Sequence, residues 1–431
     1  RRPPISTLDR SSAASDVYTR QGCGGMGLRH AFSYVELKKH ADLFDLVALC
    51  DLNAEVAEHV ALEAEKELGL KPRVYTDFDT MLSEEKNLDA VDVVTDVGLH
   101  HSLTIKALEN GLHVSVEKPM GVSVKACLQM IEAAEKAGKI LVVQENHRRY
   151  PIYRLVKHIL DKGLLGTPRL YHFASLSGDK EIAQSTAWRH IKNRGGFLLD
   201  YAVHETDVIQ YFLGGVSRVY AETQLWEHQR MTTNESGWFL ERYYKHRRKD
   251  IIETTPTVDV DSEDMCLGLM RFNSGAIGYY GRSLAAPGQP LHSDLIFCDD
   301  GSIELPSSRS GKGAKITRLG ENSPITNVEF ADLVSDFRLD DLTSKFYGNA
   351  TQLLSYEPPS NHDSKFIAMG LADFGESIIN NGTPEVGGLE GLDAVALVYS
   401  ILESGHSGSV SYTHLRAHET EADLVCRLLL E

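Results

Sequence analysis

The sequence of 431 residues lacks the features that mark several special classes of protein. It contains no run of 18 apolar residues, so we expect no membrane-spanning helix and no membrane partner. Its six cysteines are scattered, without a pair at metal-ligand spacing or the close-set pattern of small secreted domains. We therefore expect no metal site and no disulfide framework, and we expect reduced thiols of the kind typical of a cytoplasmic protein.

Positive charge is also scarce. Lysine and arginine number 44 against 61 aspartate and glutamate residues, which gives a formal net charge of −17 at pH 7. Nucleic acids and anionic membranes are bound through basic faces that neutralise phosphates, so we expect neither as a partner. With 42% hydrophobic and 24% charged residues, the composition is that of a globular protein, and the length accommodates two domains.

Both ends of the chain lack the pattern of a regular fold. A central parallel strand should read as a nearly continuous Val/Ile/Leu run, but residues 10–21 offer only Val17, Tyr18 and Thr19 as strand formers. Residues 409–431 also break the pattern. Both ends resemble translated sequencing-adapter sequence. We therefore expect residues 1–21 and 409–431 to be non-native extensions, with the first strand of the fold missing.

A glycine-rich loop opens the part of the chain that has a regular pattern. Residues 22–27 read Gly-Cys-Gly-Gly-Met-Gly and fit the pattern Gly-X-Gly-X-X-Gly, and a helix is predicted over residues 29–39. Glycines let the backbone approach a pyrophosphate, which binds at the helix N-terminus. The predicted cofactor contacts in this loop are Gly22, Gly24, Gly25, Met26 and Gly27.

Asp51 ends the next predicted strand, residues 46–51, at the distance that a dinucleotide-binding fingerprint requires. A carboxylate there accepts hydrogen bonds from an adenine ribose and repels a 2′-phosphate. Because no Arg or Lys stands beside Asp51, the pattern favours NAD over NADP. The alternative is that Asp51 caps the helix that follows.

Strands and helices continue to alternate up to residue 146, which predicts a doubly wound parallel sheet, the α/β Rossmann fold. The predicted strands are residues 88–95, 113–118 and 140–144, and the predicted helices are residues 56–68, 102–110 and 122–137. Glu117-Lys118-Pro119 lies at the carboxyl end of a strand, where ligands bind in such sheets. Lys118 could remain solvated, or it could act beside the nicotinamide as a hydrogen-bond donor or proton shuttle.

The segment of residues 195–207 places Asp200, His204 and Asp207 at helical spacing behind two glycines. A carboxylate and an imidazole four residues apart lie on one helix face, where Asp200 can fix the tautomer of His204. An ordinary surface pair is the alternative. The apolar residues around the pair favour a buried helix and a role in proton transfer.

The second half of the chain predicts a mostly antiparallel sheet. After a helix over residues 150–164, strands are predicted over residues 169–175, 216–224, 265–272, 276–284 and 293–298. Residues 226–264 exceed what a hairpin needs and form either a lid or subunit arm, or a floppy insertion. Arg148, Trp188 and Arg189 are candidates to line the cleft and bind a sugar. A structural ion pair is the alternative for both arginines and is favoured for Arg189.

The chain from residue 22 to about residue 408 resembles the glucose-fructose oxidoreductase / inositol dehydrogenase (Gfo/Idh/MocA) family. In chain order, the resemblance lies in the glycine loop, Asp51, His100, residues 107–114, Glu117-Lys118-Pro119, residues 146–151, Trp188-Arg189 and residues 195–207. It implies a Rossmann domain over residues 22–146, followed by an α+β domain over residues 147–408. This second domain would contain a large, mostly antiparallel open sheet, bind the substrate and mediate oligomerisation.

Residue by residue, the resemblance makes Lys118, Asp200 and His204 catalytic, and we expect these three to bind the substrate together with Arg148 and Trp188. It makes Asp207 structural or substrate-contacting. The cofactor contacts it implies beyond the glycine loop are Asp51, Thr95, His100, Glu117 and Lys118. The chain departs from the family at Asp96, where proline is usual, and at Phe197 and Ala202, where glycine is usual. Asp96 is expected to bring a carboxylate near the nicotinamide edge.

The resemblance implies an NAD-dependent oxidoreductase that transfers hydride between nicotinamide and a secondary hydroxyl of a sugar, sugar derivative or cyclitol. His204, oriented by Asp200, would accept the hydroxyl proton while Lys118 holds the oxygen. The alternative is an NAD-dependent glycosidase or lyase that acts by transient oxidation and elimination and retains its cofactor. A homodimer or homotetramer is expected, because the exposed face of such a sheet often becomes an interface.

Overall fold

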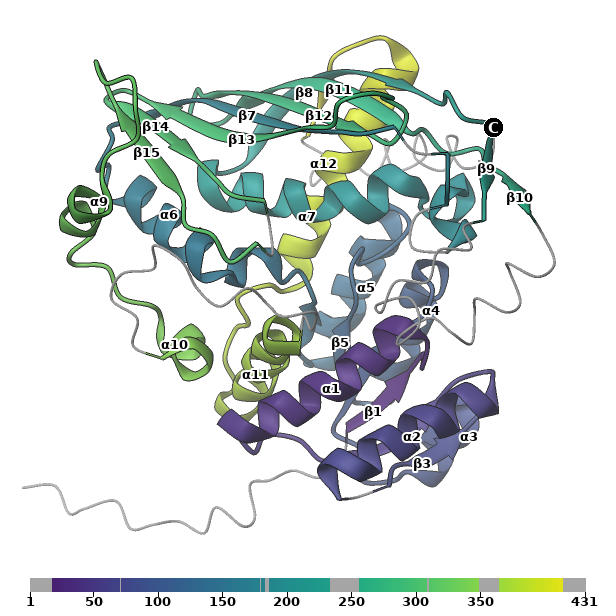
Figure 1. Ribbon diagram of the computed structural model, residues 1–431. Coiled ribbons are helices and arrows are strands. Elements are labelled where there is room, and N and C mark those ends of the chain that lie inside the picture. The colour runs from purple at the N-terminus through teal and green to yellow at the C-terminus, as the bar shows by residue number, and fades with distance from the viewer. Residues whose placement is uncertain are drawn as a thin grey trace, which may run out of the picture.

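The computed structural model describes residues 18–69, 71–178, 180–182, 186–232, 256–307, 310–348 and 364–413. Two large sheets organise these residues (Figure 1). The first has six strands in the order β3-β2-β1-β4-β5-β6, and the second has eight in the order β15-β14-β13-β7-β12-β11-β8-β16.

All neighbouring strands of the six-stranded sheet pair in parallel, and helices alternate with the strands along the chain. The strands are β1 (Tyr18–Gln21), β2 (Leu46–Cys50), β3 (Arg73–Tyr75), β4 (Ala90–Val93), β5 (His113–Val116) and β6 (Leu141–Val143). The helices are α1 (Gly25–His40), α2 (Ala54–Leu68), α3 (Phe78–Glu84), α4 (Val97–Glu109) and α5 (Val124–Ala137). The predicted Rossmann fold is confirmed.

The prediction that the first strand is missing is wrong. Residues 18–21 form β1 at the centre of the sheet, between β2 and β4, and Ser411–Tyr412 form β16 beside β8. Strand pairing uses backbone N–H and C=O groups, so a segment with few strand-forming side chains can still occupy the central position. Residues 1–17 and 414–431 lie outside the described residues.

The eight-stranded sheet is antiparallel except where β12 pairs with β7, which confirms the predicted second sheet. Its strands, in addition to β16, are β7 (Pro168–Leu176), β8 (Val216–Gln224), β11 (Met265–Phe272), β12 (Ile277–Ser283), β13 (Leu291–Cys298), β14 (Gly301–Glu304) and β15 (Lys315–Arg318). The helices α6 (Pro151–Asp161) and α7 (Gly196–Leu213) lie between this sheet and the Rossmann fold (Figure 1).

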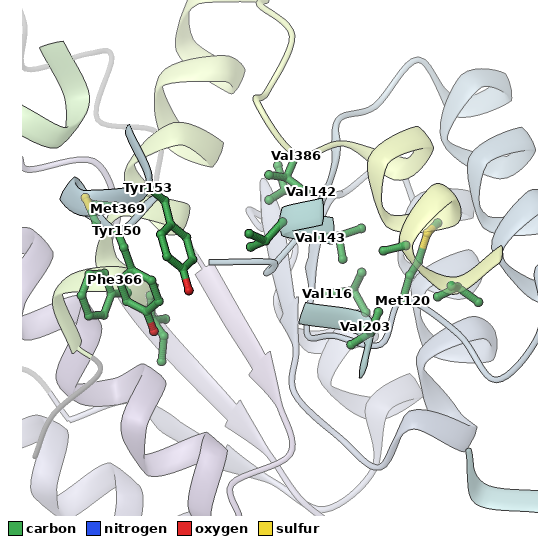
Figure 2. Packing of buried hydrophobic residues seen from close by; sticks show 14 of the residues in the cluster. Val116, Met120, Val142, Val143, Tyr150, Tyr153, Val203, Phe366, Met369 and Val386 are labelled. Carbon is green, nitrogen blue, oxygen red and sulfur yellow. The ribbon is translucent and has the colours of Figure 1, made fainter. Parts of the chain in front are cut away.

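The two C-terminal helices join both parts of the molecule. α11 (Ser364–Asn380) packs against α1, and α12 (Gly388–Ser407) packs against α5, α7 and β8. One hydrophobic core therefore extends through the molecule. Figure 2 shows part of it, where Val116 and Val143 of the Rossmann sheet lie near Val203 of α7.

Shorter elements complete the described structure. They are the 3-10 turns η2 (His147–Arg149), η4 (Ala187–His190) and η5 (Lys192–Arg194), the helices α9 (Asn327–Leu333) and α10 (Asp341–Tyr347), and the paired strands β9 (Gln229–Met231) and β10 (Thr257–Asp259). The ribbon of β9 and β10 belongs to the long segment of residues 226–264, of which residues 233–255 lie outside the described residues. None of the helices in the described ranges is long and apolar enough to cross a membrane.

Candidate active site

A cavity of about 380 Å³ lies between the carboxyl ends of the Rossmann strands and the inner face of the eight-stranded sheet. Cavities of this size accommodate small-molecule ligands. The predicted site residues that line it are Met26, Thr95, His100, Glu117, Lys118, Trp188, Arg189, Asp200 and His204. The structure thus brings together residues that are far apart in the sequence.

The glycine loop lies at the N-terminus of α1, beside Asp51. Gly22 has φ +90°, and a Cβ there would lie 2.5 Å from the Val94 carbonyl oxygen, so only glycine fits. The Asp51 carboxylate accepts a hydrogen bond of 2.7 Å from the backbone N–H of Cys23. Gly24 caps α1 without a side-chain hydrogen bond. The first N–H groups of α1 are therefore available to a dinucleotide pyrophosphate, and the loop fits NAD.

His100 connects the two loops that follow β4 and β5. Its Nδ1 lies 2.8 Å from the Pro119 carbonyl oxygen and its Nε2 lies 3.2 Å from that of Thr95. Burial lowers the pKa of His100, which favours the neutral ring, and a neutral ring donates to only one of the two carbonyl oxygens at a time. The predicted cofactor residues Thr95 and His100 are therefore part of one rigid wall of the cavity.

The carboxylate of Glu117 is hydrogen-bonded to a buried histidine, His30 of α1. The Nε2 of His30 lies 2.8 Å from Glu117 Oε1, and its Nδ1 lies 2.6 Å from Asp92 Oδ2. Burial lowers the pKa of His30, but the two carboxylates outweigh this effect and the pKa is raised. The other oxygen of Glu117 accepts a hydrogen bond from the backbone N–H of Lys118, so this network fixes the loop that carries the lysine.

Asp200 binds two cations rather than His204, which differs from the sequence prediction. Lys118 Nζ donates to the Asp200 carbonyl oxygen at 2.7 Å and to its Oδ1 at 3.2 Å, and Arg189 Nε donates to Oδ2 at 2.6 Å. Burial raises the pKa of Asp200, but Arg189 and Lys118 outweigh burial and hold the pKa well below its usual range. Asp200 is therefore a carboxylate that positions the lysine.

The partner of His204 is Glu145, which follows β6. His204 Nδ1 lies 2.5 Å from Glu145 Oε2, and the ring of His147 stacks on that of His204 with centroids 4.0 Å apart. Burial raises the pKa of Glu145 to about 8. We did not predict Glu145 or His147 as site residues. Their position just after a parallel strand was the available signal, because such strand ends meet at one edge of the sheet.

Arg148 does not line the cavity, which corrects its prediction as a substrate contact. Its Nε donates to Asp207 Oδ2 at 2.9 Å and its Nη2 donates to Oδ1, and both residues are buried. A guanidinium and a carboxylate in this two-bond geometry satisfy each other. The buried pair favours a structural role for Asp207 over a substrate contact.

Three further residues have local structural roles. Asp96 caps α4 by accepting a hydrogen bond of 3.0 Å from the Gly98 N–H. It does not line the cavity, although we expected its carboxylate near the nicotinamide edge. Phe197 is fully buried, and its N–H donates to Ser262 Oγ at 3.0 Å. Trp188 lines the cavity and carries the Arg189 guanidinium 4.5 Å from its ring centroid.

The wall formed by the eight-stranded sheet carries residues that we did not predict. Its members on β7, β12 and β13 are Tyr171, Phe173, Ser175, Arg282, His292 and Asp294. Whether they share a face depends on the register between strands distant in sequence, which the sequence does not show. The wall faces Glu205 of α7, whose two carboxylate oxygens bind Arg282 at 3.0 Å and Tyr280 at 3.2 Å.

Comparison with known proteins identifies relatives of both parts of the chain. Residues 21–145 match the model of an oxidoreductase family with an NAD-binding Rossmann fold, and residues 153–304 match the GFO/IDH/MocA C-terminal domain. The two matches together span more than half of the chain. The predicted family and the predicted cofactor, NAD, are confirmed.

Similar proteins include scyllo-inositol 2-dehydrogenase (NAD(+)) of Bacillus subtilis, 28% identical over 67% of this chain and 73% of that enzyme. An alpha-N-acetylgalactosaminidase of Shewanella oneidensis is 33% identical over 34% of this chain and 32% of the relative. The structure of a levoglucosan dehydrogenase in complex with NADH superposes with a TM-score of 0.68 at 20% identity, covering 92% of this chain and 98% of that one. Several other curated relatives match over 38% to 64% of their length.

Proposed function

The chain belongs to the Gfo/Idh/MocA oxidoreductase family, and from this premise we propose that it is an NAD-dependent dehydrogenase of a sugar, sugar derivative or cyclitol. It would transfer hydride between nicotinamide and the carbon of a secondary hydroxyl group. The observation that carries the proposal is that Lys118, Asp200 and His204 line one cavity, where Lys118 pairs with Asp200 and His204 pairs with Glu145, which is buried behind it. Scyllo-inositol and levoglucosan, named in two similar proteins, are cyclic polyols.

In this proposal Lys118, Asp200 and His204 are the catalytic group. When bound, NAD supplies the hydride acceptor. The glycine loop and Asp51 would hold its pyrophosphate and adenine ribose. His204 Nε2 accepts the hydroxyl proton while Nδ1 is directed to Glu145, and Lys118 Nζ donates a hydrogen bond to the same oxygen. Asp200 keeps Lys118 in place. Trp188 supplies an apolar face to the ring.

The proposal is tested with purified protein, a set of sugars and cyclitols, and NAD or NADP. We expect NADH to accumulate with at least one polyol, and expect Lys118→Met and His204→Asn each to reduce kcat by about 10²-fold or more. NADH affinity of both variants should stay within a few-fold of the wild type. A variant that keeps the kcat of the wild type, or that loses turnover only because it no longer binds NADH, would contradict these roles.

A second candidate is a glycosidase or lyase that oxidises its substrate transiently, eliminates a leaving group and is reduced again. The similarity to an alpha-N-acetylgalactosaminidase favours it. The same lysine and histidine would serve both reactions. Cleavage of a nitrophenyl glycoside without net formation of NADH supports the glycosidase, whereas stoichiometric NADH supports the dehydrogenase.

We further propose a homodimer or homotetramer, with an NAD-binding domain up to residue 146 and a substrate-binding and oligomerisation domain over residues 147–408. The outer face of the eight-stranded sheet supports this assembly, because Tyr220, Leu269 and Ile277 are exposed there. A cytoplasmic location is supported by the five described cysteines, none of which forms a disulfide with another described residue.

A further inference from the structure

The inner face of the eight-stranded sheet presents side chains to the cavity in regular rows. β13 pairs with β7 so that His292 lies opposite Ser175 and Asp294 lies opposite Phe173. Side chains two residues apart in a strand share a face, so all four belong to the cavity wall that they line. Asp294 is the only one of the four that carries a carboxyl group.

Asp294 is buried but incompletely satisfied. The residue is 5% exposed, and the Tyr171 hydroxyl donates a hydrogen bond to the carboxyl group. Its Oδ1 has no hydrogen-bond partner among the described residues. Buried polar atoms nearly always have a partner, so an unpaired carboxyl oxygen in a cavity wall indicates a partner that arrives with the ligand.

Glu205 provides the comparison within the same cavity. Both of its carboxylate oxygens are hydrogen-bonded, one to Arg282 and the other to Tyr280. Arg282 is thereby committed to Glu205, and no ion pair joins Asp294 to a described lysine, arginine or histidine. Burial, with a further contribution from Glu205, raises the pKa of Asp294 to about 7. Asp294 thus differs from Glu205 in having capacity for another hydrogen bond.

We propose that Asp294 is a specificity-determining residue that hydrogen-bonds one hydroxyl group of a cyclic polyol substrate, on the side of the ring that faces β7 and β13. This inference rests on the proposed function, because it takes the substrate to be a polyol. The hydroxyl read by Asp294 is distinct from the one that reacts near Lys118 and His204. A polyol lacking that hydroxyl would leave the carboxyl oxygen unpaired, and sites of this kind reject such analogues strongly.

The test measures the dissociation constants of scyllo-inositol, levoglucosan and their monodeoxy analogues for the NADH-bound protein. We expect the wild type to bind one deoxy analogue at least tenfold more weakly than its parent polyol. In Asp294→Leu this difference should fall below twofold, because the variant has no group that reads the hydroxyl. Asp294→Asn should retain part of the difference, since an amide also bonds a hydroxyl. Asp300→Leu, in the exposed turn after β13, is the matched control and should behave as the wild type.

The outcomes separate this inference from the proposed function. Polyols that bind with an Asp294-dependent deoxy penalty but never yield NADH would contradict the dehydrogenase and support the role of Asp294. Polyols that are oxidised with the same deoxy penalties in wild type and in Asp294→Leu would overturn the role of Asp294. A wild type that binds neither these two polyols nor any other member of the set of sugars and cyclitols would overturn both. Melting temperatures within a few degrees of the wild type would show that the variants are folded.

Discussion

At the scale of the residue, two buried carboxyl groups position the two groups that would meet the substrate. Asp200 binds Lys118, and Glu145 binds His204. Helical spacing correctly predicted that Asp200 and His204 share a helix. It did not show which charged side chains from other elements bind Asp200 and His204. Asp200 lies beside Lys118 and Arg189, and two cations attract a buried carboxylate more strongly than a neutral imidazole does.

Glu145 determines which nitrogen of His204 carries the proton. Above about pH 8, the pKa of Glu145, the side chain is a carboxylate that accepts from Nδ1–H, so Nε2 carries no proton and can accept one from an alcohol. Below that pKa the Glu145 carboxyl donates to Nδ1, and Nε2 carries the proton. We therefore expect kcat for alcohol oxidation to rise as the pH increases through about 8, and kcat for carbonyl reduction to fall.

Glu145→Gln removes the titrating group and should lower kcat for oxidation about 10²-fold, because an amide does not stabilise the histidine cation that forms. The pH profile should lose its inflection near 8, while NADH affinity stays within a few-fold. Steady-state kinetics across pH measure this, with Glu67→Gln on the exposed face of α2 as control. An unchanged pH profile in Glu145→Gln would exclude the positioning role.

The same substitution has a readout in stability. The pKa of Glu145 in the fold, about 8, lies above its ordinary value of 4.5, so the folded state binds the proton more tightly. This contribution to stability is fully present below pH 4.5 and is lost as the pH rises through 8. The wild type should therefore lose stability relative to Glu145→Gln over this range.

At the scale of the element, α7 carries Asp200 and His204, and its N-terminus depends on two glycines. Gly195 and Gly196 have φ of +101° and +70°, and a Cβ on Gly196 would lie 2.2 Å from Ser262 Oγ. Neither backbone conformation suits a residue with a side chain. These glycines let the chain turn into the helix beneath the loop that contains Ser262.

Gly196→Ala should therefore destabilise the fold by about 2–4 kcal/mol, from left-handed backbone strain plus the steric clash with Ser262. It should also lower kcat, because the clash displaces the first turn of α7. Gly69→Ala at the end of α2 is the matched control, because Gly69 is left-handed (φ +75°, ψ 1°) and no atom lies within 4 Å of the added Cβ. We expect it to cost about 1–2 kcal/mol and to leave kcat unchanged. Urea unfolding measures the stability of the two variants, and steady-state kinetics measures their kcat. Equal losses of stability in the two variants would contradict the clash with Ser262.

Sequence patterns predicted the elements better than their contacts. The glycine loop, the strand end at Asp51 and the helix with His204 have local signatures, because spacing along the chain sets turns and helix faces. Glu145 has only its position just after a strand, and Asp294 has no local signature. The first acquires its role from the neighbouring order of β5 and β6, and the second from the register of β13 on β7. Both are long-range properties that no local pattern encodes.

At the scale of the whole molecule, the C-terminal segment from Val386 onward packs against the N-terminal Rossmann domain. The N–H of Val143 in β6 donates to the Val386 carbonyl at 3.0 Å, and α12 then packs on α5, α7 and β8 (Figure 1). The residues that line the cavity from the Rossmann sheet and from α7 therefore share one core with the C-terminal helices. This packing fixes Lys118 relative to His204.

In the described part of the chain, the outer face of the eight-stranded sheet carries exposed apolar side chains. The register places Tyr220, Leu269, Tyr279 and His172 in one row across β8, β11, β12 and β7. Leu269 is 54% exposed, and exposed apolar faces of this kind mark interfaces. We expect Leu269→Glu to convert the proposed oligomer to a monomer, because a buried, unpaired carboxylate opposes association. Leu52→Glu, at an 88% exposed leucine on the other domain, should leave the assembly intact. Light scattering coupled to size-exclusion chromatography measures both, and a monomeric wild type would disprove the interface.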